Sequence, residues 1–441
     1  MVQASSVLGF GVFGLAVVAE RVEAGEAVVE VESPGGRVVF CAACGARARS
    51  KGRRMVQLRD APLAGGMPVR VLWNKRIWSC PNSGCGAGTW TEESGLAGAR
   101  RVLTERAVDH AVGALGAAGV SVAGLARLLG VGWHTVWAAV LPALRQAVDD
   151  PGRVAPAARV GFDETVMGSA TRLRRRRFVS AAVDADTGQV LDVFDGRDAA
   201  DLRRWALQQP RERMAAVEVV CLDPHEGYRK AVRALKDLGV LGPGVRVAAD
   251  PFHIVRLANR AVDDCRRRTQ NETTGHRGRR GDPLYGARKL LLKGSERLDA
   301  RGWDRLHRAL HDGDPYDEIA DCWAAKEKIR AVFQADDPYQ AADLLDEAIE
   351  YCRAPEAAPE LHKLARTLHR WRTEINTSTS TGAHNGRTEA ANAKIKDIKR
   401  SARGYANLAN YRLRILFATG QKPGQTQPVT KIRTRRPRFN A

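Results

Sequence analysis

The sequence predicts an α/β core that carries a large all-helical insertion, preceded by a small β domain and a short helical hairpin. Short apolar runs alternate with Gly and Pro turns over residues 1–95, and the spacing becomes helical from about Arg100. Strand and helix patterns then alternate between Arg159 and Pro251, before long helical patterns begin. We place the domains at residues 1–95, 96–150, 151–252, 253–375 and 376–420, with a basic tail at 421–441.

The charge balance is the unusual property of the composition. The 70 Lys and Arg against 50 Asp and Glu give a net charge of +20, which predicts a polyanionic partner. The 44% of hydrophobic residues excludes wholesale disorder. The apolar stretch Val7 to Val18 is too short to span a bilayer and lacks a preceding basic segment. We therefore expect no membrane partner, and a soluble cytoplasmic protein that associates with nucleic acid in the nucleoid.

Four cysteines form two pairs within the β domain. Cys41 and Cys44 precede Gly45, and 35 residues separate them from Cys80 and Cys85, which precede another glycine, Gly86. Each pair would place two thiolates at a tight turn, an arrangement typical of tetrahedral structural zinc. We therefore predict a zinc-ribbon-like domain over residues 1–95. The alternative is four reduced, partly buried cysteines without a metal.

The helical hairpin has the outline of a helix-turn-helix. Ser121 is a candidate N-cap, Gly130 separates two apolar stripes, and the second helix would present His134 and Thr135 to a DNA major groove. The stripes comprise Val122, Leu125, Ala126 and Leu129, then Trp133, Val136, Trp137 and Val140. A helical hairpin within a protein core would produce the same spacing.

The core region has the element order of a ribonuclease H-like fold. Strand patterns at 159–165, 177–183 and 190–194 precede a helix at 201–207, and the run 217–222 ends at Asp223. The first of these strands carries Asp163, an acid where a buried strand is normally apolar. In this fold the first and fourth strands are neighbours, so we expect Asp163 and Asp223 to meet.

Other interpretations of these aspartates remain open. Asp223, with Pro224 and Glu226 after it, could simply cap a helix. Asp250 follows the strand pattern 245–249 and is a rival for the second carboxylate, although a fifth strand would lie one position further out. We treat His253 as a residue at the start of a helix or behind the site.

A third acid is expected from a helix near the end of the core. At about 100° per residue, Glu389 shares one face with Asn392 and several cations, while Ala391, Ile395 and Ile398 form the opposite face. An acid among cations is expected where a metal meets a nucleic-acid phosphate, although a salt-bridged surface helix has the same pattern. The candidate phosphate-binding cations are Lys394, Lys396, Lys399 and Arg400, together with Arg174, Arg175, Arg176 and Arg177.

These motifs resemble the ISL-three group of bacterial insertion-sequence transposases, within the DDE transposase class. The matching segments are the paired knuckles with Trp78-Ser-Cys80-Pro, the hairpin from Ser121 to Val140, Gly161-Phe-Asp163-Glu, Leu222-Asp223, Ala249-Asp250-Pro-Phe-His253, Glu389-Ala-Ala-Asn392-Ala-Lys394-Ile-Lys396, Gly404-Tyr405 and Tyr411-Arg412-Leu. Phe162 departs from the residue that most often precedes the first acid. The resemblance implies that Asp163, Asp223 and Glu389 are catalytic and that the helices from His253 to Glu374 are an insertion.

The resemblance also implies a mechanism and partners. The three carboxylates would hold two magnesium ions for in-line phosphoryl transfer, with water and then a 3′ hydroxyl as nucleophile. The zinc ribbon and helix-turn-helix would bind the terminal inverted repeats, and a homodimer would act on double-stranded end and target DNA. The alternatives are a non-catalytic DNA-binding regulator and a structure-selective nuclease. Magnesium-dependent nicking and strand-transfer products would distinguish the three.

Overall fold

The computed structural model describes residues 13–117, 119–168 and 176–420. The chain divides into two compact units, Met1–Arg153 with Lys394–Ala441, and Val154–Ala393. The first unit therefore joins segments from both ends of the sequence, and the second contains the predicted core and insertion.

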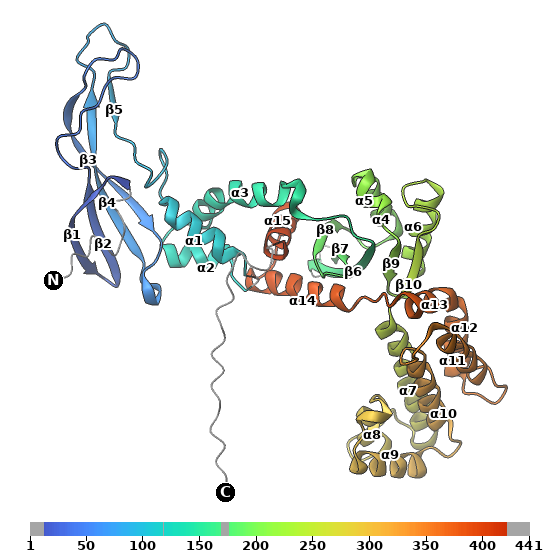
Figure 1. Ribbon diagram of the computed structural model, residues 1–441. Helices are drawn as coiled ribbons and strands as arrows, with labels where there is room; N and C mark the ends of the chain where they lie inside the picture. Colours follow the sequence, from blue (N-terminus) through green and yellow to red (C-terminus); the bar gives the residue numbers. More distant parts are fainter. Residues whose placement is uncertain (1–12, 118, 169–175, 421–441) are drawn as a thin grey trace. The chain divides into compact units, whose positions relative to one another are not determined.

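The first unit begins with a sheet of five strands (Figure 1). Its order is β1-β2-β4-β3, with β5 paired to β4. Buried residues such as Val31, Val71 and Trp73 form the core of this domain. The β character expected for residues 1–95 is therefore present. The strands are β1 (Ala16–Glu23), β2 (Glu26–Glu32), β3 (Arg49–Asp60), β4 (Val69–Ser79) and β5 (Thr89–Thr91).

Three helices follow the sheet in this unit: α1 (Glu105–Leu115), α2 (Val122–Leu129) and α3 (Trp133–Asp149). Ser121 caps α2 by accepting a hydrogen bond from the Gly124 amide, and Gly130 ends it in the left-handed conformation. The axes of α2 and α3 differ by 115°, within the range for a helix-turn-helix. The predicted second stripe is only partly correct. Val136 and Val140 are buried, whereas Trp133 is exposed and stacks on Trp137.

The C-terminal helix α15 (Leu408–Thr419) packs against α3 and α1 in the same unit. The guanidinium of Arg414 is fully enclosed there and donates to the carbonyl oxygens of Leu115 at 2.7 Å and Val120 at 3.2 Å. These carbonyls lie at and beyond the end of α1, where helical backbone acceptors have no intrahelical partner. Arg414 therefore satisfies the turn between α1 and α2.

The second unit is built on a sheet with the order β10-β9-β6-β7-β8. β6 pairs antiparallel with β7 and parallel with β9, which confirms the predicted contact between the first and fourth strands of the core. The strands are β6 (Arg159–Gly168), β7 (Arg177–Asp184), β8 (Val190–Asp195), β9 (Val219–Leu222) and β10 (Arg246–Ala249).

Both faces of this sheet are buried. Because alternate strand residues point in opposite directions, each strand contributes side chains to both faces. Val220 and Leu222 pack with Phe162 against α4 (Ala199–Leu207) and α6 (Glu226–Asp237). Val219 and Cys221 belong to a separate cluster on the other face, with Ala383. The short helix α5 (Arg211–Ala215) joins α4 to β9. A strand buried on both faces accounts for the continuous apolar run 219–222.

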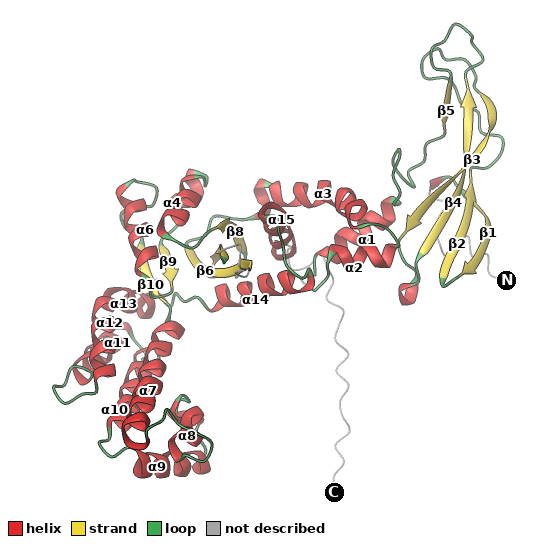
Figure 2. Cartoon of the chain, turned by 180° about the vertical axis from the view of Figure 1, so that it is seen from behind, coloured by secondary structure: helices red, strands yellow, loops and turns green. Residues whose placement is uncertain are grey.

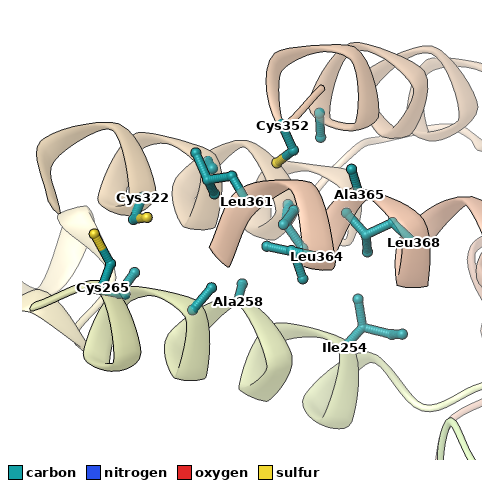
Figure 3. Close-up of a cluster of buried hydrophobic side chains, with 14 of the residues drawn as sticks. Ile254, Ala258, Cys265, Cys322, Cys352, Leu361, Leu364, Ala365 and Leu368 are labelled. Atoms are coloured by element: carbon teal, nitrogen blue, oxygen red, sulfur yellow. The ribbon is translucent and has the colours of Figure 1, made fainter. Parts of the chain in front are cut away.

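The helical insertion has its own hydrophobic core. Figure 3 shows Leu361, Leu364 and Leu368 of α12 beside Ala258 and Ile254 of α7. Four further cysteines in the second unit are free and buried, so none forms a disulfide. The helices are α7 (Pro251–Thr274), α8 (Pro283–Leu291), α9 (Ala300–Gly313), α10 (Glu318–Val332), α11 (Pro338–Tyr351), α12 (Pro359–Arg370) and α13 (Arg372–Thr381).

The polar segment before the last acid is more helical than its composition indicates. α13 continues to Thr381, and a short connection leads to α14 (Gly386–Ser401). α14 begins in the second unit and ends in the first. In Figure 2, the connection between α13 and α14 passes close to β10.

Among the described residues, no single helix has the length and apolar composition of a membrane span, whereas α2 and α3 meet that test when taken together as a bent pair.

Candidate active site and cysteine cluster

Two of the predicted acids lie at the same edge of the second sheet. In the parallel pairing of β6 with β9, Gly161 lies opposite Cys221. Asp163 and Asp223 each stand two residues further along their strands. Asp163 also raises the pKa of Asp223 electrostatically, as expected for two carboxyl groups that are close together. The structure therefore brings these two predicted residues together.

Asn385 connects this edge to the start of α14. Its side-chain amide lies 3.3 Å from the Asp223 carboxylate and 3.5 Å from the Phe162 carbonyl oxygen. Its backbone N–H donates to Asp250 at 2.8 Å. Asn385 is 1% exposed, and its own amide oxygen has no hydrogen-bond partner among the described residues. One buried residue thus contacts β6 and the residues that follow β9 and β10, three neighbouring strands of the sheet.

Asn392 holds the other acid. Its amide donates a hydrogen bond to a carboxylate oxygen of Asp163. The other Asp163 oxygen accepts from the backbone N–H of Glu164 at 2.7 Å. Asn392 is also 1% exposed, with a buried amide oxygen that lacks a partner among the described residues.

Glu389 stands between these two asparagines on α14. Positions 385, 389 and 392 are separated by four and three residues, so they share one helical face. Glu389 is half-buried and raises the pKa of His253 electrostatically. Glu389 therefore lies within electrostatic range of His253 and one helical turn from Asn392, which bonds to Asp163.

The close approach of α14 to β6 depends on Gly161. A Cβ atom at this position would overlap Oγ1 of Thr388 and lie 2.6 Å from Oδ1 of Asn385. Gly161, Thr388 and Asn385 are all buried. The absence of a side chain at Gly161 therefore lets the start of α14 lie directly against the strand that carries Asp163.

Asp250 and His253 form a bonded pair beside Asp223. Asp250 caps α7, because its side chain accepts the backbone N–H of His253 at 3.2 Å. The imidazole Nδ1 lies 3.0 Å from Asp250 and 3.1 Å from Asp223. Burial opposes a charged imidazole, but the hydrogen bond to Asp250 and the charges of Asp223 and Glu389 outweigh it and raise the pKa of His253.

The two rival aspartates differ in their surroundings. Burial raises the pKa of Asp223 to about 7, although His253 acts in the opposite direction. Burial also acts on Asp250, but the hydrogen bonds from His253 and the Asn385 backbone outweigh it and lower its pKa. Asp223 does not cap α6, which begins at Glu226 with His225 as its N-cap. Both Asp250 oxygens, in contrast, are occupied by hydrogen bonds within the protein.

The predicted DNA-binding residues lie in several places. His134 is exposed and Thr135 half-buried, both in the first turn of α3. On α14, Lys394, Lys396 and Arg400 are exposed and Lys399 is half-buried. Arg176 and Arg177 are exposed, and Arg177 forms a two-pronged ion pair with Asp195 at 3.0 and 2.8 Å. Arg174 and Arg175 lie outside the described residues.

The four predicted cysteine ligands converge in the first unit. Their sulfur atoms all lie within 4.8 Å of one another, with Cys41 and Cys85 3.8 Å apart and Cys44 and Cys80 3.5 Å apart. Zinc–sulfur bonds of about 2.3 Å in a tetrahedron require sulfur separations of about 3.8 Å. The cluster therefore fits a zinc ion. Gly45 has φ +71°, as the first knuckle requires, whereas in the second knuckle the positive φ occurs at Gly88 rather than Gly86.

The thiols of the cluster also differ in acidity. The backbone amide of Ala46 lowers the pKa of Cys44 to about 7, with a smaller contribution from Cys80. At Cys80 the amide of Asn82 acts in the same direction, but desolvation and the neighbouring thiols outweigh it and raise the pKa to about 12. Four adjacent thiols therefore do not all ionise unless a cation compensates their charge.

Sequence reasoning missed three features of the carboxylate site. It placed Asn392 on the face of Glu389 without identifying its bond to Asp163, and it assigned nothing to Asn385. The available signal was the spacing 385, 389 and 392, which puts two amides and an acid on one helical face. The bridge from His253 to Asp223 and Asp250 was also not anticipated.

The chain is similar in sequence to known transposases. The model of the ISL-three family, described as transposase, matches residues 160–415, more than half of the chain. The chain is 27% identical over 319 residues to the transposase for insertion sequence element IS1557 of Mycobacterium tuberculosis, covering 67% of this chain and 68% of that protein. It is 26% identical over 394 residues to the transposase for IS1001 of Bordetella parapertussis, covering 87% and 90%. The chain therefore belongs to the ISL-three family of DDE transposases.

Proposed function

We propose that this protein cuts and joins DNA at the ends of an insertion sequence, with Asp163, Asp223 and Glu389 as its catalytic residues. The observation that carries the proposal is the gathering of these three acids from β6, β9 and α14 around one sheet edge. Family membership implies a DNA-cleaving and DNA-joining enzyme. The residue assignments are our inference from the geometry.

The donor set suits divalent magnesium. Magnesium prefers hard oxygen ligands, often carboxylates, and Asp163, Asp223 and Glu389 provide them. Two ions held there would supply Lewis acids at the attacking and leaving oxygens of the phosphodiester. We assign the second carboxylate ligand to Asp223 rather than Asp250, because Asp223 follows β9, which pairs directly with the β6 strand that carries Asp163, whereas Asp250 follows β10, one strand further out. The site also has no need of a serine or cysteine nucleophile.

The surrounding residues would hold the acids in position. Asn392 binds one oxygen of Asp163, and Asn385 binds one oxygen of Asp223, so each amide limits the rotation of its carboxylate. Nδ1 of His253 lies within hydrogen-bond distance of both Asp223 and Asp250, and a protonated imidazole there would offset part of the repulsion among the acids. Such neighbours orient ligating groups and adjust their acidity.

DNA recognition is assigned to the first unit. His134 and Thr135, at the start of α3, would read base edges in the major groove. The cysteine cluster, with a structural zinc, would stabilise the loops of the β domain. Lys394, Lys396, Lys399, Arg400, Arg176 and Arg177 would contact phosphates. We expect a homodimer on DNA, because two element ends must be handled together, and action at inverted repeats in the cytoplasm.

The test uses the full-length protein with duplexes that contain the DNA flanking its gene. Magnesium should produce cuts at a defined phosphate and then strand-transfer products. Glu389→Gln should abolish cutting with end binding retained. Glu164→Gln, an exposed acid next to Asp163, is the matched control and should cut normally. Cutting by Glu389→Gln, or equal loss in both variants, would remove the assignment. Binding without any cutting by the natural protein would favour a regulator. Cutting that is not followed by joining would favour a nuclease.

A further inference from the structure

The helical insertion has a polarised distribution of charge. Residues 275–293, at the end of α7 and through α8, contain six cations and one acid, Asp282. Residues 314–360, which include α10 and α11, contain thirteen acids and four cations. The cations of the basic segment are Arg277, Arg279, Arg280, Arg288, Lys289 and Lys293. A polyanion would therefore be attracted to the α7–α8 end and repelled from α10 and α11.

The loop between α7 and α8 is held in one conformation by buried polar contacts. Arg266 is 3% exposed, bonds to Gln270, and donates to the carbonyl oxygen of Arg277 at 3.3 Å. Asp282 accepts the backbone N–H of Arg279 at 2.6 Å. Gly278 has φ +102°, and a Cβ there would lie 2.8 Å from Gln270. The backbone that carries the arginines is thus fixed from inside.

The arginine side chains of this loop point away from that network. Arg277, Arg279 and Arg280 are exposed, and none forms an ion pair with a described residue. Several other exposed arginines of the insertion have acidic partners, although not all of them do. The pairs include Arg308 with Asp304, Arg353 with Glu350, and Arg372 with Asp346. An ordered loop that displays three uncompensated cations is suited to a phosphate backbone.

The position of the loop fits duplex DNA engaged at the acids. α7 begins beside the site, at Asp250 and His253, and ends at the loop, where α8 begins (Figure 1). Its 24 residues, at 1.5 Å each, span about 36 Å. One helical turn of B-form DNA is also roughly 34–36 Å. A duplex that meets the acids and runs parallel to α7 would therefore present its backbone on the same side again at the distance of the loop.

We propose that Arg277, Arg279 and Arg280 form a second DNA-binding surface, which grips duplex backbone about one helical turn from the cut phosphate. This inference rests on the proposed function, because it requires DNA at the acids. Contact through phosphates alone gives grip and orientation without sequence preference. The surface would thus hold whichever duplex lies on that side of the cut.

The test replaces all three arginines, Arg277→Gln, Arg279→Gln and Arg280→Gln, in the full-length protein. The control, Arg308→Gln, Arg353→Gln and Arg372→Gln, removes the same charge from ion-paired positions of the insertion. Hydroxyl-radical footprints and salt titrations are measured on end duplexes that extend either 4 or 20 base pairs beyond each side of the cut. Far-ultraviolet circular dichroism and thermal melting check that both variants fold.

On the long duplex, the loop variant should lose protection about one turn from the cut and bind roughly tenfold more weakly. Its salt dependence should fall by up to about 2.7 in log–log slope, at roughly 0.9 per lost phosphate contact. The short duplex and the control variant should show no such change. An unchanged footprint in the loop variant, or an equal loss in the control, would overturn the inference. If the natural protein neither binds nor cuts these duplexes, the proposed function itself fails instead.

Discussion

The side-chain amide of Asn392 donates a hydrogen bond to the carboxylate of Asp163, although 229 residues separate the two in the chain. This bond ties the helix that carries the third acid to the strand that carries the first. It forms beside Gly161, where the backbone of β6 offers no side chain to block the helix. The geometry of the acids is therefore set by α14 as well as by the sheet.

Removal of the Asn392 amide should impair cleavage more than DNA binding. Loss of a group that orients a metal ligand typically costs about 10- to 100-fold in metal affinity or activity. Asn392→Ala should therefore lower the cleavage rate by about that factor, and raise the magnesium concentration that gives half-maximal cleavage. Asn376→Ala, on α13, is the matched control. A magnesium titration that is identical for Asn392→Ala and the natural protein would contradict the positioning role.

Gly161→Ala should destabilise the second unit. The added Cβ would overlap Thr388. Fitting an extra methyl group into a packed interior lowers the free energy of unfolding by about 1–3 kcal/mol. Gly244→Ala is the control, since no atom lies within 4 Å of its Cβ position and its φ is not positive. That change should stay within about 0.5 kcal/mol. Urea unfolding followed by circular dichroism measures both, and equal midpoints would show that Gly161 has more room than its neighbours indicate.

The cysteine cluster should bind one zinc ion per chain. Cys44→Ser and Cys80→Ser each remove a thiolate ligand, so zinc content should fall and the cysteine loops should become sensitive to protease. The control variant Cys352→Ala, with its substitution in the insertion, should keep the full zinc content of the protein. Metal analysis of the purified proteins, followed by limited proteolysis, tests this expectation. Full zinc content in both serine variants would mean that the ion binds elsewhere.

Asp314 should make stability depend on pH. Burial raises its pKa, although the Ile319 and Ala320 amides act in the opposite direction. A raised folded-state pKa means that the folded protein binds the proton more tightly, so stability falls as pH rises from the unfolded to the folded pKa. Asp314→Asn cannot ionise, and its stability relative to the natural protein should therefore increase from pH 3.5 to pH 7. A flat difference for Asp314→Asn would contradict the assignment.

The sequence predicted much of the carboxylate site because its acids interrupt patterns. Asp163 and Asp223 interrupt or end apolar strand runs, and the order of the elements implied that their strands pair. Glu389 was found from helical spacing. Contacts between distant polar residues leave no such trace: Asn385 meets Asp250 across 135 positions, and neither residue indicates the other.

The end of α13 was difficult to predict for a local reason. Serine and threonine disfavour helix interiors because their hydroxyls compete for backbone hydrogen bonds. In α13 these hydroxyls bond back to carbonyls one turn earlier, Thr377 to Thr373 and Thr381 to Thr377. Burial of Ile375 and Ser378 then stabilises the helix, so tertiary packing overrides the local preference.

The enclosure of Arg414 between α15 and the α1–α2 turn has a consequence for protein synthesis. The carbonyl oxygens of Leu115 and Val120 leave the ribosome about 300 residues before the guanidinium that binds them. Until then the hairpin that follows them lacks a supporting helix. A prematurely terminated or proteolysed fragment that stops after α3 would carry α3, the helix that we propose reads DNA, without this support. Such fragments would compete poorly with intact molecules for the same DNA.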